Sequence, residues 1–569
     1  MSETGRRRAT IAAVVAAAAI LLLANLGATD LWAPDEPRYA AVADEVRASE
    51  LGVSSWLLLR LNGEPYTQKP PLYFWLAAVA GTPGDHVNEV AARLPSALAG
   101  VATVVLTLQL GTMVFRQLPV GVWSSLILLT SFLFAHLARR AQLDVLLAFF
   151  ETLALWAFVR LDGGAGTRRA HLLVLHGALG CAVLTKGPVA LLPLAVIATF
   201  LAWERRLSEF RRFVPAWGLA LSLGPALIWL SAATLLAPPE FFGEAVVENL
   251  FGRFFEGTSH ARPFYYYAIQ FPVNFLPWTL LWPLAAVCAY RHLRESANAE
   301  SHPSAWRFAI AWLGVFLVFF SLSAGKRGLY LLPAFPAAAL LCGAALQEAL
   351  ARRSQLPGWL RHLLAIGLVV LAGVGLFLAW NPALEFAPGF PAPRNFAVGL
   401  VLVAALIGWT AWRWARHPGA GTLHVSLVVA GVFAIEWLLF SVALPAFDLE
   451  KSPRPIAERA SEIAPEGAPI GVYQMRPLVG GIAYYGSRAV VEIPDIASLR
   501  EFVDHGGGAI LLRASHLASL QREIRLRAVT YQRSGKRRIA IAIAETGSTQ
   551  NAVGDRPETT ESRLGKSPE

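Results

Sequence analysis

The sequence predicts an α-helical polytopic membrane protein that ends in a small α/β domain. Three observations support this prediction. First, 55% of the 569 residues are hydrophobic and only 15% are charged, whereas soluble domains carry roughly a quarter charged residues. Second, the apolar residues form long blocks, and about 18 apolar residues in a row suffice for a helix to cross a bilayer. Third, the composition changes near Asp448, after which strand-like runs alternate with helical stretches.

The apolar blocks predict about thirteen transmembrane helices. They fall near residues 10–28, 93–113, 120–138, 142–160, 170–184, 188–203, 214–236, 271–290, 306–323, 329–349, 360–380, 396–415 and 424–446. If Arg6, Arg7 and Arg8 are placed in the cytoplasm and the spans alternate, every cytoplasmic loop is basic, as the positive-inside rule requires. The same alternation places the C-terminal region outside the membrane.

The order of segments predicts three parts. Residues 1–447 are expected to form the membrane domain, with long outer loops at 29–92 and 237–270. Residues 448–546 are expected to form an extracytoplasmic α/β domain. Residues 547–569 are polar and poor in aromatic residues, which is typical of a disordered tail.

Other features narrow the class of protein. The net charge of +10 does not predict nucleic-acid binding, because the arginines form short clusters between apolar blocks. Cys181, Cys288 and Cys342 lack metal-ligand spacing and are expected to be small buried residues. The first apolar run lacks a small-x-small cleavage site, so we expect an uncleaved first span.

Basic side chains on the predicted outer face run against the topology rule and gather in compact motifs. They are Arg38, Lys69, Arg139, Arg140, Lys186, Arg253, Lys326 and Arg327. An anionic substrate at the outer membrane surface would explain their presence.

Two acidic motifs lie on the same predicted face. The first outer loop opens with Asp35-Glu36-Pro37-Arg38-Tyr39, close to the first span. An acidic pair there can orient or deprotonate a sugar-acceptor group, or it can simply begin an amphipathic helix. Asp144 begins the fourth predicted span, where the helix dipole also favours an acid.

Lysines and arginines beside prolines and glycines indicate a phosphate site. In Gln68-Lys69-Pro70-Pro71 the prolines hold the lysine near the bilayer surface, where it suits a lipid phosphate or is an ordinary interfacial lysine. The motifs Thr185-Lys186-Gly187-Pro188 and Gly325-Lys326-Arg327-Gly328-Leu329-Tyr330 can cradle a phosphate or pyrophosphate.

Three further residues carry weaker signals. Arg253 and His260 lie in the second outer loop, where a lone histidine can bind a metal or a sugar hydroxyl but is more often neither. Glu436 lies in the middle of the last predicted span, where burial costs about 2.5–3.5 kcal/mol unless the acid is protonated or paired. The sequence contains no Walker loop, no GxGxxG before a basic helix and no zinc-type Cys/His cluster. The implied donor is therefore membrane-borne rather than a nucleotide sugar bound by a Rossmann domain.

Taken in order, these motifs resemble the aminoarabinose lipid A transferase family, which belongs with the protein O-mannosyltransferases in the GT-C superfamily. The resemblance covers about residues 30–335 and is carried by Asp35 to Tyr39, Lys69-Pro70-Pro71, Arg93-Leu94-Pro95-Ser96, Thr185 to Pro188, and Lys326 to Pro333. It implies a GT-C type fold in the inner membrane and a polyprenyl-phosphate-linked sugar donor. It also implies inverting transfer at the outer face to a lipid A-type lipid, a glycan or a protein.

Together the motifs and the resemblance name the candidate site residues. The catalytic acids would be Asp35, Asp144 and Glu36; the donor phosphate would contact Arg38, Lys69, Lys186, Lys326, Arg327 and Tyr330; the acceptor side or loop would hold Tyr39, Arg253 and His260. One position departs from the family relatives, in which an acid precedes the lysine and pairs with a loop histidine at a metal. That position is Gln68 here, so no cofactor is expected to be required, and a divalent metal at His260 stays open.

The expected chemistry follows from the leaving group. Charge grows on the oxygen of polyprenyl phosphate as it departs, and preorganised lysines and arginines would stabilise that charge. For a hydroxyl acceptor Asp35 would be the general base, and for an ionised phosphate acceptor it would orient groups. Two alternatives are a transporter or flippase for an anionic polyprenyl lipid and a structural role. A transporter should show inverted repeats and discontinuous mid-membrane helices, whereas the charges here gather on one face.

Overall fold

A computed structural model describes most of the chain. The described residues are 2–48, 52–164, 167–252, 261–294, 303–352, 421–486, 488–534 and 537–544, with short pieces between 385 and 413. The predicted span at 360–380, most of the one at 396–415, the loop residues Arg253 and His260 and the predicted tail at 547–569 lie outside them. The chain forms two compact units: Met1–Ala457 with Pro477–Gly486, and Glu458–Arg476 with the described residues of Ser487–Glu569.

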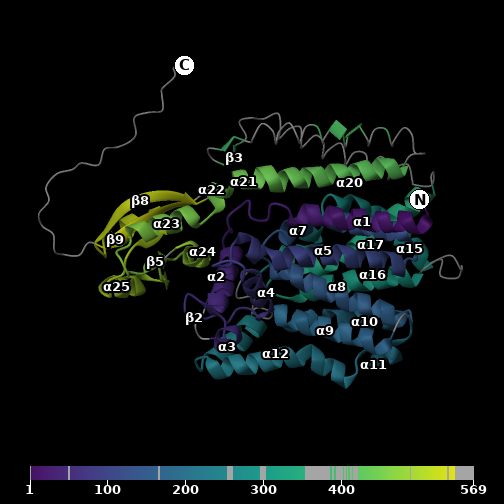
Figure 1. Ribbon diagram of the computed structural model, residues 1–569, viewed down its shortest axis with the longest axis horizontal. Helices are drawn as coiled ribbons and strands as arrows, with labels where there is room; N and C mark the ends of the chain where they lie inside the picture. The colour runs from purple at the N-terminus through teal and green to yellow at the C-terminus, as the bar shows by residue number, and fades with distance from the viewer. Residues whose placement is uncertain are drawn as a thin grey trace, which may run out of the picture. The chain divides into compact units, whose positions relative to one another are not determined.

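The first unit is built from helices that run side by side (Figure 1). Its longer helices are α1 (Glu3–Leu23), α5 (Glu89–Val114), α8 (Leu143–Asp162), α9 (Arg168–Lys186), α12 (Ala216–Leu236), α16 (Pro303–Leu322), α17 (Phe335–Ala351) and α20 (Gly421–Leu438). Shorter helices are α2 (Asp35–Ala48), α3 (Val53–Leu57), α4 (Leu72–Ala80), α6 (Leu118–Leu129), α7 (Phe132–Ala138), α10 (Leu192–Trp203), α11 (Phe210–Phe213), α14 (Tyr266–Asn274), α15 (Trp282–Arg294), α21 (Leu444–Ala446) and α22 (Asp448–Lys451).

Tighter and wider helical turns and two small hairpins complete this unit. The 3₁₀ turns are η1 (Pro188–Leu191), η2 (Leu207–Glu209), η4 (Trp278–Leu281) and η5 (Gly328–Ala334), and the π-helical turns are η3 (Gly243–Gly252) and η7 (Leu439–Ala443). The strands pair antiparallel as β1 (Arg60–Leu61) with β2 (Glu64–Pro65), and β3 (Glu385–Ala387) with β4 (Phe390–Pro391).

The helices confirm a polytopic membrane fold. Within the described residues, five are long and apolar enough to cross a membrane, and two bent pairs raise the number to seven. In the first bent pair α6 and α7 meet at 68°, and in the second α14 meets Trp278–Arg294 at 108°. The predicted total of thirteen spans stays a prediction.

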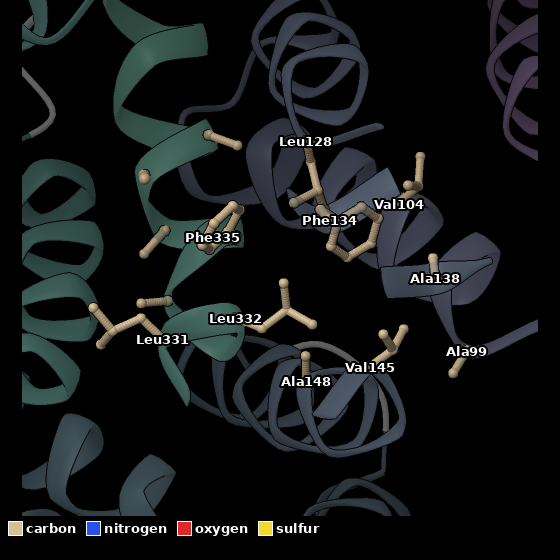
Figure 2. Close-up of a cluster of buried hydrophobic side chains, with 14 of the residues drawn as sticks. Ala99, Val104, Leu128, Phe134, Ala138, Val145, Ala148, Leu331, Leu332 and Phe335 are labelled. Atoms are coloured by element: carbon tan, nitrogen blue, oxygen red, sulfur yellow. The ribbon is translucent and has the colours of Figure 1, made fainter. Parts of the chain in front are cut away.

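The core of the first unit fixes the elements whose ends carry the charged motifs. Figure 2 shows Val104, Leu128, Phe134, Leu332 and Phe335 converging from α5, α6, α7, η5 and α17, and each of these side chains has no exposed surface. Between membrane helices such side chains stabilise the bundle through close van der Waals packing rather than through removal from water. The ends of these helices are thereby held in fixed relative positions.

Small residues let α6 pack closely between two neighbours. A Cβ added to Gly111 of α5 would lie 2.7 Å from the Cα of Gly121 of α6. A Cβ added to Gly343 of α17 would lie 2.7 Å from the backbone nitrogen of Ser124 of α6. Close approach through small residues is the usual way in which membrane helices associate.

One short helix from the C-terminal part of the sequence belongs to the first unit. In α24 (Arg476–Tyr485), the hydroxyl oxygen of Tyr485 accepts a hydrogen bond from the backbone N–H of Leu31 at 2.7 Å. Gly480 lies so close to α2 that an added Cβ would stand 2.6 Å from the Cβ of Arg38. Only glycine allows this approach, and α24 therefore covers the beginning of α2.

The second unit contains a five-stranded sheet, which confirms the small C-terminal α/β fold. Its strands are β5 (Ile470–Tyr473), β6 (Val490–Ile493), β7 (Ile510–Arg513), β8 (Leu526–Ser534) and β9 (Arg537–Ala544), in the order β6-β5-β7-β9-β8. The first three are parallel, and β9 is antiparallel to β7 and β8. Its helices include α25 (Ile496–Asp504) and α26 (Ala514–Leu520), while α23 (Arg454–Ile463) begins in the first unit.

The close packing of α6 predicts a sharp difference between two glycine substitutions. Gly121→Ala would place a methyl group against the carbonyl oxygen of Leu108, and overpacking of this kind costs about 1–3 kcal/mol. Gly314→Ala, in α16 with no heavy atom within 4 Å of the added Cβ, should leave stability unchanged or slightly raised. Thermal unfolding in detergent, followed by tryptophan fluorescence, measures both; equal midpoints would contradict the packing described.

Candidate active site

The acidic motif Asp35-Glu36 begins α2, and its two acids lie in different clusters. Asp35 and Glu36 lie in the first turn of the helix, where the dipole favours negative charge. Both residues are buried, with exposed fractions of 6% and 1%. Buried carboxylates need charged or hydrogen-bonding partners, and each acid has its own set.

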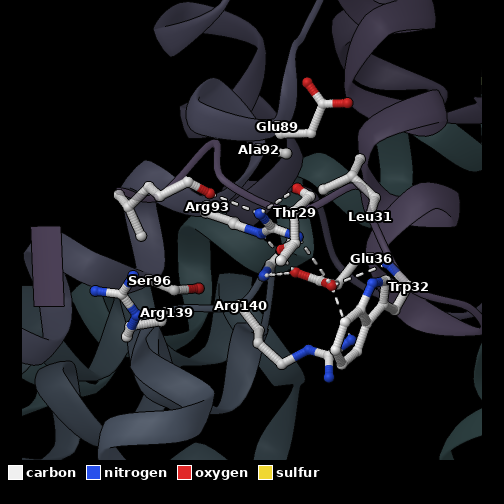
Figure 3. Close-up of polar contacts among 12 residues, drawn as sticks. Thr29, Leu31, Trp32, Glu36, Glu89, Ala92, Arg93, Ser96, Arg139 and Arg140 are labelled. Carbon is white, nitrogen blue, oxygen red and sulfur yellow. Dashed lines mark hydrogen bonds and ion pairs between the residues drawn. The ribbon is translucent and has the colours of Figure 1, made fainter. Parts of the chain in front are cut away.

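Glu36 is held by two arginines and two backbone amides (Figure 3). Its carboxylate oxygens lie 2.9 Å from Nε of Arg93 and 2.8 Å from Nη2 of Arg140. The backbone N–H groups of Ala141 and Trp32 donate to the same carboxylate at 3.0 and 3.1 Å. The carboxylate is thereby shared between α2, α5 and the segment that joins α7 to α8.

These contacts keep Glu36 ionised. Burial by itself would raise the pKa of the carboxyl, but Arg140 and Arg93 outweigh burial and hold the pKa well below its ordinary value of 4.5. Arg93 also donates to the backbone carbonyls of residues 26, 29 and 30. The cluster therefore fixes the chain between α1 and α2 as well as the start of α2.

Asp35 faces a second cluster. One carboxylate oxygen lies 2.5 Å from Nη2 of Arg38, one turn further along α2, and the other lies 3.3 Å from Nη2 of Arg327. The Arg38 guanidinium also stacks 5.3 Å from the ring centre of Tyr39. Asp35 thus lies between two arginines that are themselves partly exposed.

Asp144 forms the other acidic element of the site. It lies in the first turn of α8, is 4% exposed, and forms an ion pair with Nζ of Lys186, the last residue of α9. The same Nζ stands 4.3 Å from the ring centre of Tyr330. A cation against an aromatic face is favourable, so Lys186 is held from two sides.

The turn η5 joins the two acids. Arg327 precedes η5 and contacts Asp35, and Tyr330 within η5 contacts Lys186. Burial by itself would lower the pKa of the Arg327 guanidinium. Its pKa is raised instead, first by Asp35 and then by Tyr330 and Asp144. Both carboxylates therefore act on one guanidinium, and the predicted residues from α2, α8, α9 and η5 converge on one site.

Several predicted residues have other surroundings. Lys326 is 4% exposed, and its Nζ donates to the backbone carbonyls of Ser323 and, at 3.1 Å, Arg262. Lys69 lies half-buried in the loop before α4. Tyr39 is buried against the ring of Phe74, 5.6 Å away between centres.

Two buried acids lie apart from these ion pairs. Glu151 stands two turns beyond Asp144 in α8, has no exposed surface, and neither of its carboxylate oxygens has a hydrogen-bond partner in the described part of the chain. Glu436 of α20 is 3% exposed, and its two carboxylate oxygens likewise lack a hydrogen-bond partner in the described part of the chain. Glu436 was singled out from the sequence, whereas Glu151 was missed, although a single acid inside an apolar run was the signal available.

The arrangement suits the binding of an anion next to a carboxylate base. Arg38, Arg327 and Lys186 supply positive charge from three elements, and Asp35 and Asp144 stand beside them. Among the described residues no group of three or more His, Cys, Asp or Glu is arranged to hold a metal ion, and the proposed metal ligand His260 lies outside those residues.

Comparisons of sequence identify relatives. Residues 9–242 match the model of the dolichyl-phosphate-mannose-protein mannosyltransferase family. The chain is 31% identical over 435 residues to the undecaprenyl phosphate-alpha-4-amino-4-deoxy-L-arabinose arabinosyl transferase of Pseudomonas paraeruginosa, covering 74% of this chain and 75% of the relative.

Comparisons of structure identify the same fold. The structure of ArnT from Cupriavidus metallidurans bound to undecaprenyl phosphate matches with a TM-score of 0.75 at 21% identity, covering 95% of this chain and 98% of that one. The archaeal oligosaccharyltransferase AglB from Archaeoglobus fulgidus, in complex with an inhibitory peptide and a dolichol-phosphate, matches with a TM-score of 0.52 at 13% identity, covering 90% and 70%.

The Glu36 cluster predicts a pH-dependent loss of stability. Glu36→Gln leaves the buried Arg93 and the half-buried Arg140 without their shared carboxylate, and breaking a buried pair costs about 3–5 kcal/mol. Because the folded-state pKa of Glu36 lies below the unfolded value of 4.5, its contribution is complete above pH 4.5 and is lost as the pH falls through the folded-state pKa. Chemical unfolding in detergent at neutral and acidic pH checks this.

The control for this prediction is Glu64→Gln, which removes an exposed carboxylate from β2. Surface substitutions usually change stability by less than about 0.5 kcal/mol. If Glu36→Gln were as stable as Glu64→Gln at neutral pH, the carboxylate would not organise this end of the bundle.

Proposed function

Because this chain belongs to the undecaprenyl phosphate-α-4-amino-4-deoxy-L-arabinose arabinosyl transferase family, we propose that it moves a sugar in one inverting step at the site around Asp35 and Asp144. The chain is a membrane glycosyltransferase that uses a polyprenyl-phosphate-linked donor, and it belongs to the inner membrane. The observation that supports this site most strongly is the pairing of two buried acids with cations from α2, α9 and the start of η5.

The three cations would bind the donor phosphate. Arg38, Arg327 and Lys186 are held by carboxylates and an aromatic ring before substrate arrives, so little reorganisation accompanies the reaction. As the bond between the anomeric carbon and the phosphate oxygen breaks, the electron pair stays on that oxygen. Fixed positive charge stabilises it in the transition state more than in the ground state. Lys69, from the Lys-Pro-Pro motif, would add to this group.

The acids would serve the acceptor side. The new bond forms between an acceptor oxygen and the anomeric carbon on the face opposite the departing phosphate, which inverts that centre. With a hydroxyl acceptor, Asp35 takes the proton as general base. With an acceptor phosphate that is already ionised, no proton is transferred and Asp35 orients the groups. Asp144 would position Lys186, and Glu36, whose oxygens are occupied by arginines and amides, would position α2.

The acceptor is a cell-envelope molecule, and its chemical class decides whether Asp35 acts as a general base or only orients the reacting groups. The candidates are a lipid A-type lipid, a glycan and a protein side chain. A phosphate acceptor gives a rate that does not require deprotonation of the acceptor, whereas a hydroxyl acceptor gives a rate that rises with ionisation of the base.

The proposal predicts a large and selective loss of activity. The purified protein in lipid is mixed with a panel of radiolabelled polyprenyl-phosphate sugars, and transfer or hydrolysis is followed. Removal of a general base or a preorganised charge typically costs about 10²–10⁴-fold in rate. Asp35→Asn and Arg327→Gln should each lose at least about a hundredfold, with the elution profile of the folded protein unchanged.

The matched control is Asp44→Asn on the same helix. Asp44 is paired with Arg47 and is 30% exposed, so its activity should stay within about twofold of wild type. Full activity of Asp35→Asn would refute the assignment of the base. Inactivity on every donor, together with movement of labelled lipid between leaflets, would favour a transporter or flippase for an anionic polyprenyl lipid.

We also propose thirteen spans with the N-terminus in the cytoplasm and the C-terminal α/β unit outside. The three arginines at the N-terminus and the basic loops on one side support this orientation. Alkaline phosphatase, which is active only outside the cytoplasm, should be active when fused after Glu569, and green fluorescent protein fused there should stay dark. The opposite pair of signals would require an even number of spans.

A further inference from the structure

A polar cavity lies at the end of the first unit remote from Asp35 and Asp144. It has a volume of about 390 Å³ and is lined by the end of α8, the start of α9, and η2 with α11. Figure 1 shows α2 and α4 at one end of this unit and α11 at the other. Asp144 lies in the first turn of α8 and Asp162 ends it, so at 1.5 Å per residue the cavity lies roughly 27 Å from Asp144, close to the thickness of the hydrocarbon core.

The cavity has an excess of positive charge. Its lining includes Arg160, Arg168, Arg206 and Arg212, against Asp162 and Glu209. Arg206 holds both acids, with its Nη2 at 2.5 Å from Asp162 and its Nε at 2.9 Å from Glu209. The single positive charge of Arg206 offsets one of the two negative charges. Arg160, Arg168 and Arg212 therefore remain, against one negative charge.

The other arginines have weak partners. Nε of Arg160 lies 3.5 Å from Nε2 of His171, and Nη2 of Arg168 donates to the backbone carbonyl of Arg212 at 3.1 Å. Arg212 itself reaches Glu209 at 3.3 Å, with 67% of its side chain exposed. Arg168 is also the first residue of α9, whose N-cap residue makes no side-chain hydrogen bond to the helix. Free amides at a helix start attract anions, in addition to the guanidinium groups.

Exposed apolar side chains close in sequence to residues that line the cavity indicate what kind of anion fits. Trp203 at the end of α10, Leu207 at the start of η2 and Trp217 in the first turn of α12 are 41%, 53% and 44% exposed. Tryptophans with an exposed face are typical of the membrane–water interface. A soluble anion has no use for these surfaces, whereas a lipid would place its acyl chains against them and its phosphate in the cavity.

We propose that this cavity binds the headgroup phosphate of an anionic phospholipid in the leaflet opposite the active site. The guanidinium groups of Arg160, Arg168 and Arg212 contact the phosphate, and Arg206 holds Asp162 and Glu209 away from it. Basic pockets between transmembrane helices are suited to anionic lipid headgroups. The general excess of arginine on one side of a membrane protein explains the number of arginines but not their convergence on a cavity.

Two charge-matched variants separate these explanations. The cavity variant is Arg160→Gln with Arg168→Gln and Arg212→Gln. The control variant is Arg169→Gln with Arg205→Gln and Arg211→Gln, which removes the same charge from the same loops at exposed residues that do not line the cavity. Each protein is placed in nanodiscs of equimolar phosphatidylcholine and phosphatidylglycerol, and native mass spectrometry counts the lipids that stay bound after release.

The cavity variant should retain phosphatidylglycerol at least about tenfold less than wild type, since loss of one charge-assisted bond weakens binding about tenfold. The control variant should bind like wild type. Equal losses in both variants, or no loss in either, would overturn the proposal. So would equal retention of phosphatidylcholine, or displacement of the lipid by millimolar inorganic phosphate, which would make the site a free-phosphate site.

If the cavity variant fails to fold, the single change Arg168→Gln keeps the test decisive. This side chain bonds only a backbone carbonyl among the contacts described, so its loss should not disturb folding. Unchanged lipid retention in Arg168→Gln beside a wild-type elution profile would count against the site.

Discussion

One end of this helical bundle depends on one buried carboxylate shared by two arginines. Glu36 gathers Arg93 from α5 and Arg140 from the segment before α8, and Arg93 in turn binds carbonyls of the chain after α1. None of these charges can be buried alone near a bilayer, because desolvation of each exceeds the free energy that most single contacts provide. The charged groups of the cluster therefore come together as a unit, and their contacts fix the position of α2.

This constraint explains why two adjacent acids can have different tasks. Both carboxylate oxygens of Glu36 accept hydrogen bonds within its cluster, so this side chain stays ionised and fixed in place. Asp35, one residue earlier, points toward Arg38 and Arg327, which retain 22% and 34% of their side-chain surface. A carboxylate between partly exposed cations can exchange partners with a substrate, whereas a fully enclosed one cannot. The rigid Glu36 cluster therefore holds the start of α2, and with it Asp35, in a fixed position.

The sequence was sufficient for the helical membrane class and the C-terminal sheet, because long apolar blocks and short strand-like runs have direct physical meaning. Asp35, Asp144, Lys186 and Arg327 lie in separate motifs, yet each motif marks an element end at the same face, and the structure brings these ends together.

The sequence did not predict which way individual charged side chains would point. Lys326 and Arg327 are neighbours, but the lysine turns to the backbone carbonyls of Ser323 and Arg262 while the arginine turns to Asp35. No local pattern distinguishes these two outcomes, since tertiary packing decides them. Glu151 was missed although, like Glu436, it is a single acid inside an apolar block, so a local signal for it was present in the sequence. The place of α24 is equally non-local: its glycine matters only because α2 lies against it.

The contact between α24 and α2 has a consequence for biosynthesis. Residues 477–486 leave the ribosome after every membrane helix described here, so the cover over α2 is the last part of the first unit to be synthesised. The start of α2, with Asp35 and Glu36, therefore lacks its cover until the C-terminal region has been synthesised, and a chain truncated before residue 477 would lack that cover altogether.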